Sequence, residues 1–291
     1  MKRLRFSALI LAILLLCSLF VSCTKNPPDN TDDSNDDTEN VDPRCSVDIL
    51  KTGKSDCIVI NTGSKVIMID TGEEENLPTI HSYMKEMDYK RIDALILTHF
   101  DKDHIGGASE IISTYEIGTV FESFFFCDSK EYLDYHSAIT STGCKITRLT
   151  SNYSFKSDVC EITIDVPKKN KYKEKQDNNS SLIVLLNCGE KRLLFCADAM
   201  EIRLAEFLDE EYGQFDFVKL PYHGNYIENY GLFIDGVKPS YAAITCSKKN
   251  PSEERTLSFL YGLDVEVYQT RYGQIRIESD GKQIEIKYAS N

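Results

Sequence analysis

Two imidazoles and two carboxylates occur within six consecutive residues, from His99 to His104, in the segment THFDKDHIGG at residues 98–107. Four polar side chains this close together are costly to bury unless each finds a partner. A divalent cation can satisfy them, because imidazole suits zinc and carboxylates suit zinc, manganese or magnesium. A solvated turn with incidental histidines and aspartates is the alternative. We favour a metal site of His99, Asp101, Asp103 and His104, because the segment follows an apolar run and precedes two glycines.

The elements on either side of this segment predict how it is held. The largely apolar run at residues 92–97 predicts a buried strand that delivers His99. Residues 107–115 predict a helix, and we expect Gly106 and Gly107 to let the backbone turn sharply into it.

Three more residues with suitable chemistry lie at the ends of predicted strands, namely Asp70, Asp198 and His223. Residues far apart in the sequence commonly meet at strand termini in an α/β scaffold. The chain has five histidines, and the remaining two, His81 and His136, lie in helix-like segments beside polar residues. We therefore expect Asp70, Asp198 and His223 to join the loop, and His81 and His136 to lie on the surface.

Short strands and helices alternate along the rest of the chain. Periodicity predicts helices at 76–87, 107–115, 130–140, 200–208 and 253–261. It predicts strands at 46–51, 57–61, 65–70, 92–97, 119–125, 145–149, 159–166, 182–186, 192–196, 215–220, 241–245, 265–269, 273–278 and 283–287. This order indicates an α/β fold with two sheets packed together and helices outside.

The first 44 residues have a different character. Lys2, Arg3 and Arg5 precede an apolar run at residues 6–21 that ends at Ser22-Cys23. This resembles the signal of bacterial lipoproteins, so residues 1–22 are interpreted as a signal peptide and Cys23 as lipidated. An ordinary cleaved signal and an uncleaved anchor are the alternatives. Residues 23–44 are rich in aspartate and predict a disordered tether, which leaves a single domain at 45–291. We therefore expect an extracytoplasmic protein anchored to the membrane through Cys23.

Charge and cysteine content limit the possible functions. The formal net charge is −13, so the chain is a poor general binder of nucleic acid. A local basic loop still occurs before residue 178, where Lys168, Lys169 and Lys171 could overhang the site and contact an anionic substrate. The alternative is that these lysines only make a flexible loop soluble. No cysteines from residue 45 onward form a Cys-x-x-Cys pair, which argues against a structural zinc cluster, and most are expected to be small buried hydrophobes.

Taken in order, these motifs resemble the metallo-β-lactamase superfamily and, within it, the ComEC-type hydrolase domain of DNA-uptake competence proteins. The resemblance covers about residues 46–288 and implies an αββα sandwich. The segments that carry it are Asp70-Thr71-Gly72, residues 98–107, Asp198 and His223-Gly224, with GKSDC at 53–57, NNSSL at 178–182 and LPYHG at 220–224.

The resemblance also implies a ligand scheme. His99 and Asp101 would hold one metal position, Asp103, His104 and His223 would hold the second, and Asp198 would bridge them. Asp70 would orient the loop, with Asn179 and Tyr222 also beside the site. Asp101 stands where most of the superfamily has histidine, no histidine lies near Asn179, and Tyr222 replaces the first of two paired histidines. We therefore expect one or two divalent ions, zinc or manganese, with a ligand-poor first position.

The function implied is a metal-dependent hydrolase that uses an activated water, most simply a phosphodiesterase or nuclease. Asp103 could accept a proton, and Tyr222 could either donate to a developing oxyanion or only pack. The alternatives are a binding lipoprotein that lost turnover and a hydrolase of a carbonyl substrate such as a lactam, lactone or thioester. The partners expected are the membrane and DNA or another anionic phosphodiester. No obligate protein partner is inferred.

Overall fold

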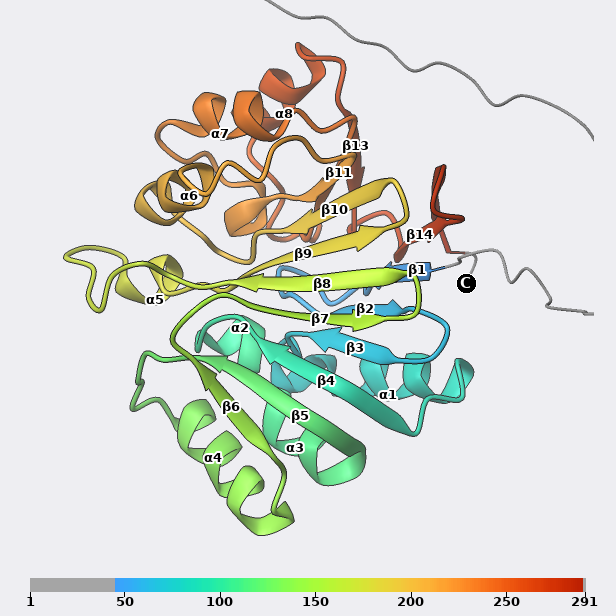
Figure 1. Ribbon diagram of the computed structural model, residues 1–291, viewed down its shortest axis with the longest axis vertical. Helices are drawn as coiled ribbons and strands as arrows, with labels where there is room; N and C mark the ends of the chain where they lie inside the picture. The colour runs from blue at the N-terminus through green and yellow to red at the C-terminus, as the bar shows by residue number, and fades with distance from the viewer. Residues whose placement is uncertain (1–44, 290–291) are drawn as a thin grey trace, which may run out of the picture. The chain divides into compact units, whose positions relative to one another are not determined.

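The computed structural model of the protein describes residues 45–289, and these form two β-sheets packed face to face, each covered by helices on its outer side (Figure 1). The αββα sandwich that was expected is therefore confirmed. The predicted signal peptide, the lipidated Cys23 and the acidic tether lie outside the described residues. None of the helices between residues 45 and 289 is both long enough and apolar enough to cross a membrane.

The first sheet has eight strands in the order β15-β14-β1-β2-β3-β4-β5-β6. Neighbours from β3 to β6 run parallel, and the other neighbours run antiparallel. The bounds are β1 (Cys45–Ile49), β2 (Ile58–Asn61), β3 (Val66–Ile69), β4 (Arg91–Leu97), β5 (Glu116–Ser123), β6 (Ile146–Leu149), β14 (Ile275–Ser279) and β15 (Ile284–Tyr288).

The second sheet has seven strands in the order β13-β12-β11-β10-β9-β8-β7. Neighbours from β10 to β13 run parallel, whereas β7 to β10 form an antiparallel meander. The bounds are β7 (Tyr153–Ser157), β8 (Cys160–Asp165), β9 (Ile183–Cys188), β10 (Lys191–Phe195), β11 (Phe217–Lys219), β12 (Tyr241–Ile244) and β13 (Glu266–Gln269).

The helices divide between the two outer faces and one edge. On the first sheet lie α1 (Leu77–Glu86), α3 (Ala108–Thr114) and α4 (Lys130–Thr142), and on the second lie α6 (Glu201–Leu208), α7 (Tyr230–Val237) and α8 (Glu254–Tyr261). The short helices α2 (Lys102–Ile105) and α5 (Gln176–Asn179) lie on the same side of the sandwich, as Figure 1 shows. Single 3-10 turns, η1 (Glu74–Asn76) and η2 (Pro221–Gly224), complete the elements.

Three apolar cores hold the four layers together. The central core lies between the sheets and is built from alternate residues of their strands, such as Val47, Ile162 and Val184. Each outer core lies between a sheet and its helices. Because the β4 residues from Ala94 to Leu97 are buried on both faces, this strand reads as a continuous apolar run, as expected for a parallel strand.

The sequence prediction missed two elements of ordinary length, β7 and α7. β7 is an edge strand whose burial is low along most of its length, so it lacks a clear alternating pattern. α7 has two glycines in eight residues and begins after Asn229, which has a left-handed backbone. Both elements exist because of what they pack against, and their local pattern does not predict them.

Candidate metal centre

Asp70 organises the loop that follows β4. This fully buried carboxylate accepts hydrogen bonds from the Thr98 backbone N–H at 2.8 Å, the Thr98 hydroxyl at 2.7 Å and His104 Nδ1 at 2.7 Å. The backbone N–H of Thr71 donates to the His104 carbonyl at 2.7 Å. The ends of the neighbouring parallel strands β3 and β4 are thus joined, and the position of His104 is set by the segment Asp70-Thr71.

The partners of the three site histidines fix which ring nitrogen carries the proton. The Asp70 carboxylate can only accept, so His104 Nδ1 is the donor. The Thr98 hydroxyl donates to Asp70, so its oxygen accepts from His99 Nδ1 at 3.1 Å. In each ring Nε2 is then left with a free lone pair for a ligand.

The tautomer of His223 is likewise set by a chain of polar contacts, which runs between the two sheets. The Thr245 hydroxyl donates to Asp56 at 2.7 Å, so its oxygen accepts from His223 Nδ1 at 2.9 Å. Asp56 is in turn held by a buried ion pair with Lys219. The result is a third imidazole whose Nε2 has a free lone pair.

The free atoms of these residues converge. His104 Nε2 and His223 Nε2 lie 3.4 Å and 3.3 Å from Asp198 Oδ1, and His223 Nε2 lies 3.3 Å from Asp103 Oδ2. Two compact groups result, one of His99, His104 and Asp198 and one of Asp103, His104 and His223, each with its donor atoms within 4.8 Å of one another.

These atoms fit a divalent ion on two counts. Within residues 45–289, Nε2 of His99, His104 and His223 and Oδ1 of Asp198 are buried without any hydrogen-bond partner, which is costly unless a ligand satisfies them. Donors about 2.0–2.1 Å from a tetrahedral zinc ion lie about 3.3 Å apart, close to the separations found here. The donor set, imidazole nitrogen with carboxylate oxygen, suits zinc or manganese.

Charge at the centre also favours a cation. Burial opposes ionisation of Asp198, but the adjacent His223 and His104 outweigh it and hold the pKa of this carboxyl well below its usual range. Burial likewise disfavours the charged form of His104, yet Asp198 and Asp70 raise its pKa well above the usual value. The carboxylates that hold protons on these imidazoles would hold a metal ion in their place.

The remaining expected ligand, Asp101, differs from the others. Its carboxylate is 38% exposed and lies 3.5 Å from His99 Nε2, outside both compact groups. Asp101 also precedes the first residue of α2, and its backbone carbonyl accepts a hydrogen bond from the N–H of His104 at 2.9 Å. Asp101 is therefore placed at the solvent side of His99, where it can approach an ion bound there.

Gly106 and Gly107 are required for a different reason from the one expected. Both have negative φ, −57° and −89°, so the expectation of a sharp turn that needs glycine is wrong. A Cβ on Gly107 would lie 2.6 Å from the Thr71 carbonyl oxygen, and one on Gly106 would lie 2.8 Å from the Glu73 backbone. The glycines allow the segment after β3 to lie directly against the segment after β4.

Four non-glycine residues with a strained backbone lie at the same strand ends. Asp70, Ala197, Tyr222 and His223 all have φ between 47° and 59°, a left-handed conformation that costs about 1 kcal/mol or more per non-glycine residue. Each lies within a few residues of the end of β3, β10 or β11. The contacts of the site hold the backbone in this conformation and so direct the side chains inward.

The side chains of Asn179 and Tyr222 are not part of either compact group. Asn179 is buried, but its amide contacts the backbone of Arg203 and Glu174, while Asn178 Nδ2 lies 3.4 Å from Asp198 Oδ2. Tyr222 packs against the core under α6 to α8.

The three loop lysines are engaged elsewhere or point to solvent. Lys168 lies 2.5 Å from the carboxylate of Glu210, just after α6. Lys169 lies 3.6 Å from the carboxylate of Glu206, within α6. Lys171 is exposed to solvent. Their charge is thus partly neutralised by α6, which weakens the case for a basic rim.

Sequence reasoning did not assign roles to Asp56, Lys219, Thr245 and Lys54. Lys219 carried a usable signal, because a charged residue inside an apolar strand needs a buried partner. Lys54 lies over the ring of Tyr222, the residue before His223, with Nζ 5.5 Å from the ring centroid.

Comparisons with known proteins agree with this geometry. Residues 50–123 match the sequence model of the Metallo-beta-lactamase superfamily. Recombination protein 2 of Haemophilus influenzae is 24% identical over 261 residues, which cover 85% of this chain and 30% of that protein. Competence protein ComA of Neisseria gonorrhoeae is 22% identical over 215 residues, which cover 72% of this chain and 28% of that protein. The chain thus spans less than a third of the length of either relative.

The fold has solved counterparts. The crystal structure of the metallo-beta-lactamase fold protein YhfI from Bacillus subtilis superimposes with a TM-score of 0.53 at 12% identity, covering 78% of this chain and 96% of that one. The matched model, the recombination and competence relatives and the shared fold together identify a metallo-beta-lactamase superfamily domain in this chain.

Proposed function

We propose that this protein is a metal-dependent hydrolase that cleaves phosphodiester bonds outside the cytoplasm, anchored to the membrane through Cys23. The observation that carries the proposal is the convergence of three imidazole Nε2 atoms and Asp198 Oδ1, all buried without a partner within residues 45–289. Partnerless buried donors arranged at ligand spacing are costly in a protein that never binds an ion.

The roles of the residues follow from their positions. His99, His104, His223, Asp103 and Asp198 would hold one or two divalent ions, zinc or manganese, with Asp101 completing the position near His99. When bound, such ions polarise the bond to be cleaved and lower the pKa of water.

Asp103 is the proposed proton acceptor. Burial opposes its ionisation, but the adjacent His223 and His104 hold the pKa of this carboxyl below its usual range, so it stays ionised. Its position beside the ligand atoms is the geometry that a general base requires.

An anionic phosphodiester such as DNA is the proposed substrate. The relatives that cover most of the chain are named for recombination and competence. Lys54 lies over the ring of Tyr222, the residue before His223, and is the cation proposed to contact a phosphate. Lys168, Lys169 and Lys171 remain weaker candidates for that contact, because Glu210 and Glu206 lie beside the first two of them.

Two other functions stay open. The exposed position of Asp101 leaves the site near His99 with fewer ligands, which favours a binding lipoprotein without turnover. A carbonyl substrate such as a lactam, lactone or thioester would suit the same ions.

The test uses the full-length protein, stripped with a chelator and reloaded with zinc or manganese. A nitrophenyl phosphodiester, single-stranded DNA and a chromogenic lactam are offered in parallel. We expect metal-dependent cleavage of the phosphodiesters, lost in His104→Ala and kept in His81→Ala, which lies on α1, outside the first sheet, and whose ring hydrogen-bonds to Tyr115. Full activity of His104→Ala would refute the assignment.

Metal content and substrate preference separate the alternatives. Two equivalents of metal support the enzyme, and none supports the binding lipoprotein. Preferential cleavage of the lactam would favour the carbonyl hydrolase. Incorporation of labelled palmitate that is lost in Cys23→Ala tests the anchor separately.

A further inference from the structure

A second group of ligand atoms lies away from the His/Asp centre. The sulfur atoms of Cys45, Cys160 and Cys188, here called the cysteine triad, all lie within 4.8 Å of one another. Cys160 and Cys188 are directly opposite each other on the antiparallel strands β8 and β9, and Cys45 comes from β1 of the other sheet. The triad therefore joins the two sheets.

The placement of the triad is systematic. The inward-facing row of β1 is Cys45, Val47 and Ile49, that of β8 is Cys160, Ile162 and Ile164, and that of β9 is Val184, Leu186 and Cys188. Each row ends in cysteine at the same end of the sandwich, while every other position of these rows is branched and aliphatic. The three sulfurs thus share one layer of the central core.

Turns from both sheets close the chain over this layer. Gly189 follows Cys188, and Gly281 lies two residues after Ser279, the strand partner of Cys45. The N–H of Glu190 donates to the Gly281 carbonyl at 2.6 Å. The frame around the triad is thus set by contacts between the sheets, which favours a site with its donors already in position.

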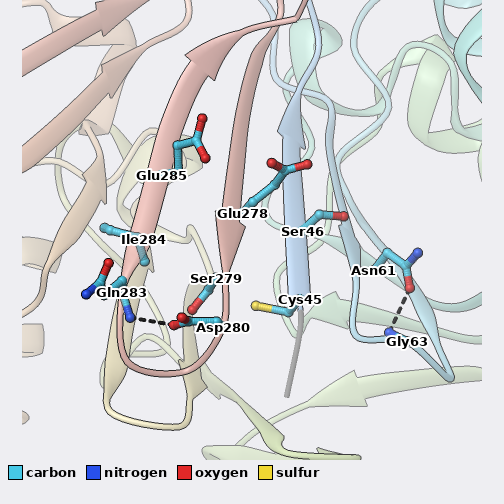
Figure 2. Close-up of a pocket in the computed structure, with 10 residues that line it drawn as sticks. All are labelled: Cys45, Ser46, Asn61, Gly63, Glu278, Ser279, Asp280, Gln283, Ile284 and Glu285. Carbon is cyan, nitrogen blue, oxygen red and sulfur yellow. Dashed lines mark hydrogen bonds between the residues drawn. The ribbon is translucent and has the colours of Figure 1, made fainter. Parts of the chain in front are cut away.

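A cavity gives access to Cys45. It has a volume of about 520 Å³ and lies between β1, β14 and the β14–β15 turn. Figure 2 shows the Cys45 sulfur directed toward Ser279 and Asp280, within the ring of residues that line the cavity. Glu278, Asp280 and Glu285 also line it, and this acidic surrounding attracts cations.

We propose that the cysteine triad binds a soft monovalent metal ion, of which Cu(I) is the prototype. Thiolates select soft ions such as Cu(I) and zinc. Three sulfurs at about 2.3 Å from a central ion lie about 4 Å apart, which small shifts of these side chains reach. Structural zinc takes four ligands, whereas the group found within residues 45–289 supplies three.

Charge favours the monovalent ion as well. A single thiolate neutralises Cu(I), and the other two sulfurs can bind as the thiolate or the thiol, with displaced protons passing to solvent. An ion here would link the two sheets.

The triad and the His/Asp centre lie at opposite ends of β9. Leu182, just before this strand, donates its N–H to the Thr98 carbonyl beside His99, and Cys188 ends the strand. Six residues of extended chain span about 20 Å. The proposal therefore does not rest on the proposed hydrolase, and either can fail alone.

The test titrates Cu(I) into the reduced full-length protein under anaerobic conditions, in competition with a chromogenic copper chelator. We expect one tightly bound ion whose copper-edge X-ray absorption shows sulfur neighbours, and a rise in Tm of roughly 5–10 °C at saturation. Cys188→Ala should bind at least 100-fold more weakly, whereas Cys246→Ala, another buried cysteine, should bind as the wild type does.

Three results would overturn the proposal. They are a copper edge with only nitrogen and oxygen neighbours, unchanged affinity in Cys188→Ala, and a reduced wild type that binds no copper. If Cys188→Ala fails to fold, the absorption spectrum of the wild type decides, because it identifies the neighbours of the ion directly. Zinc bound in preference to Cu(I) through the same sulfurs would also refute the choice of a monovalent ion.

Discussion

Asp70→Asn is the substitution that isolates how the His/Asp centre is built. The side chain keeps its size, but one acceptor oxygen becomes an NH2 donor. Asp70 now accepts from three donors, two on Thr98 and one on His104. If the new amide group faces the His104 ring, Nδ1 must become the acceptor and the proton moves to Nε2, which can then no longer bind a metal.

The magnitude follows from these contacts. Loss of a group that orients a metal-bound histidine typically costs 10–100-fold in metal affinity, or about 1.4–2.7 kcal/mol. In the metal-free protein, a buried donor facing another donor costs about 1–3 kcal/mol of folding free energy. Asp70→Asn should therefore weaken both metal binding and stability.

Asp48→Asn is the matched control. Asp48 is equally buried and accepts from Tyr83, Gln274 and two nitrogens of Arg276, outside the centre. It should lower stability without changing metal affinity. Affinity is measured by competition with a fluorescent chelator, and stability by urea denaturation with metal removed. Zinc affinity of Asp70→Asn within about twofold of the wild type, alongside a destabilised Asp48→Asn, would show that Asp70 does not control the tautomer of His104.

Three further substitutions test other parts of the centre. Lys219→Met leaves the buried Asp56 carboxylate without its ion pair and should cost about 3–5 kcal/mol in urea denaturation of the metal-free protein; a loss below 1 kcal/mol would contradict the buried pair. Gly107→Ala places a Cβ 2.6 Å from the Thr71 carbonyl and should cost about 1–3 kcal/mol, with weaker metal binding in the same chelator assay. Tyr222→Phe keeps the packed ring, so kcat should hold; a fall of about 100-fold would assign the hydroxyl to an oxyanion.

The local pattern of apolar and polar residues was sufficient to predict many of the helices and strands. The apolar strand β4, the polar loop after it and the helix α3 each have a sequence signal that does not depend on distant residues. The same is not true of β7, where an exposed edge needs no apolar face, or of α7, where glycines lower helix propensity and packing restores it.

The cysteines show the limit of spacing rules most clearly. Cys160 and Cys188 are separated by the whole of β8 and β9, and Cys45 lies on the other sheet, so no short motif links them. The absence of Cys-x-x-Cys pairs argued against a cluster, yet the strand register and the packing of the sheets bring the three sulfurs together. Register is set by the whole sheet, and spacing along the chain does not reveal it.

The sequence by itself determined which chemical groups stand at the strand ends, since His99, Asp103, His104, Asp198 and His223 each follow a run whose apolar pattern marks a strand. Only the tertiary structure decided how those groups are held. The contacts that set the His223 tautomer and bury Lys219 join residues 189 and 163 positions apart, from different sheets. The hydrogen-bond partner of an imidazole decides which ring nitrogen carries the proton, and packing decides that partner. The sequence therefore predicts which residues supply ligand atoms, but it does not predict which ring nitrogen is free to bind.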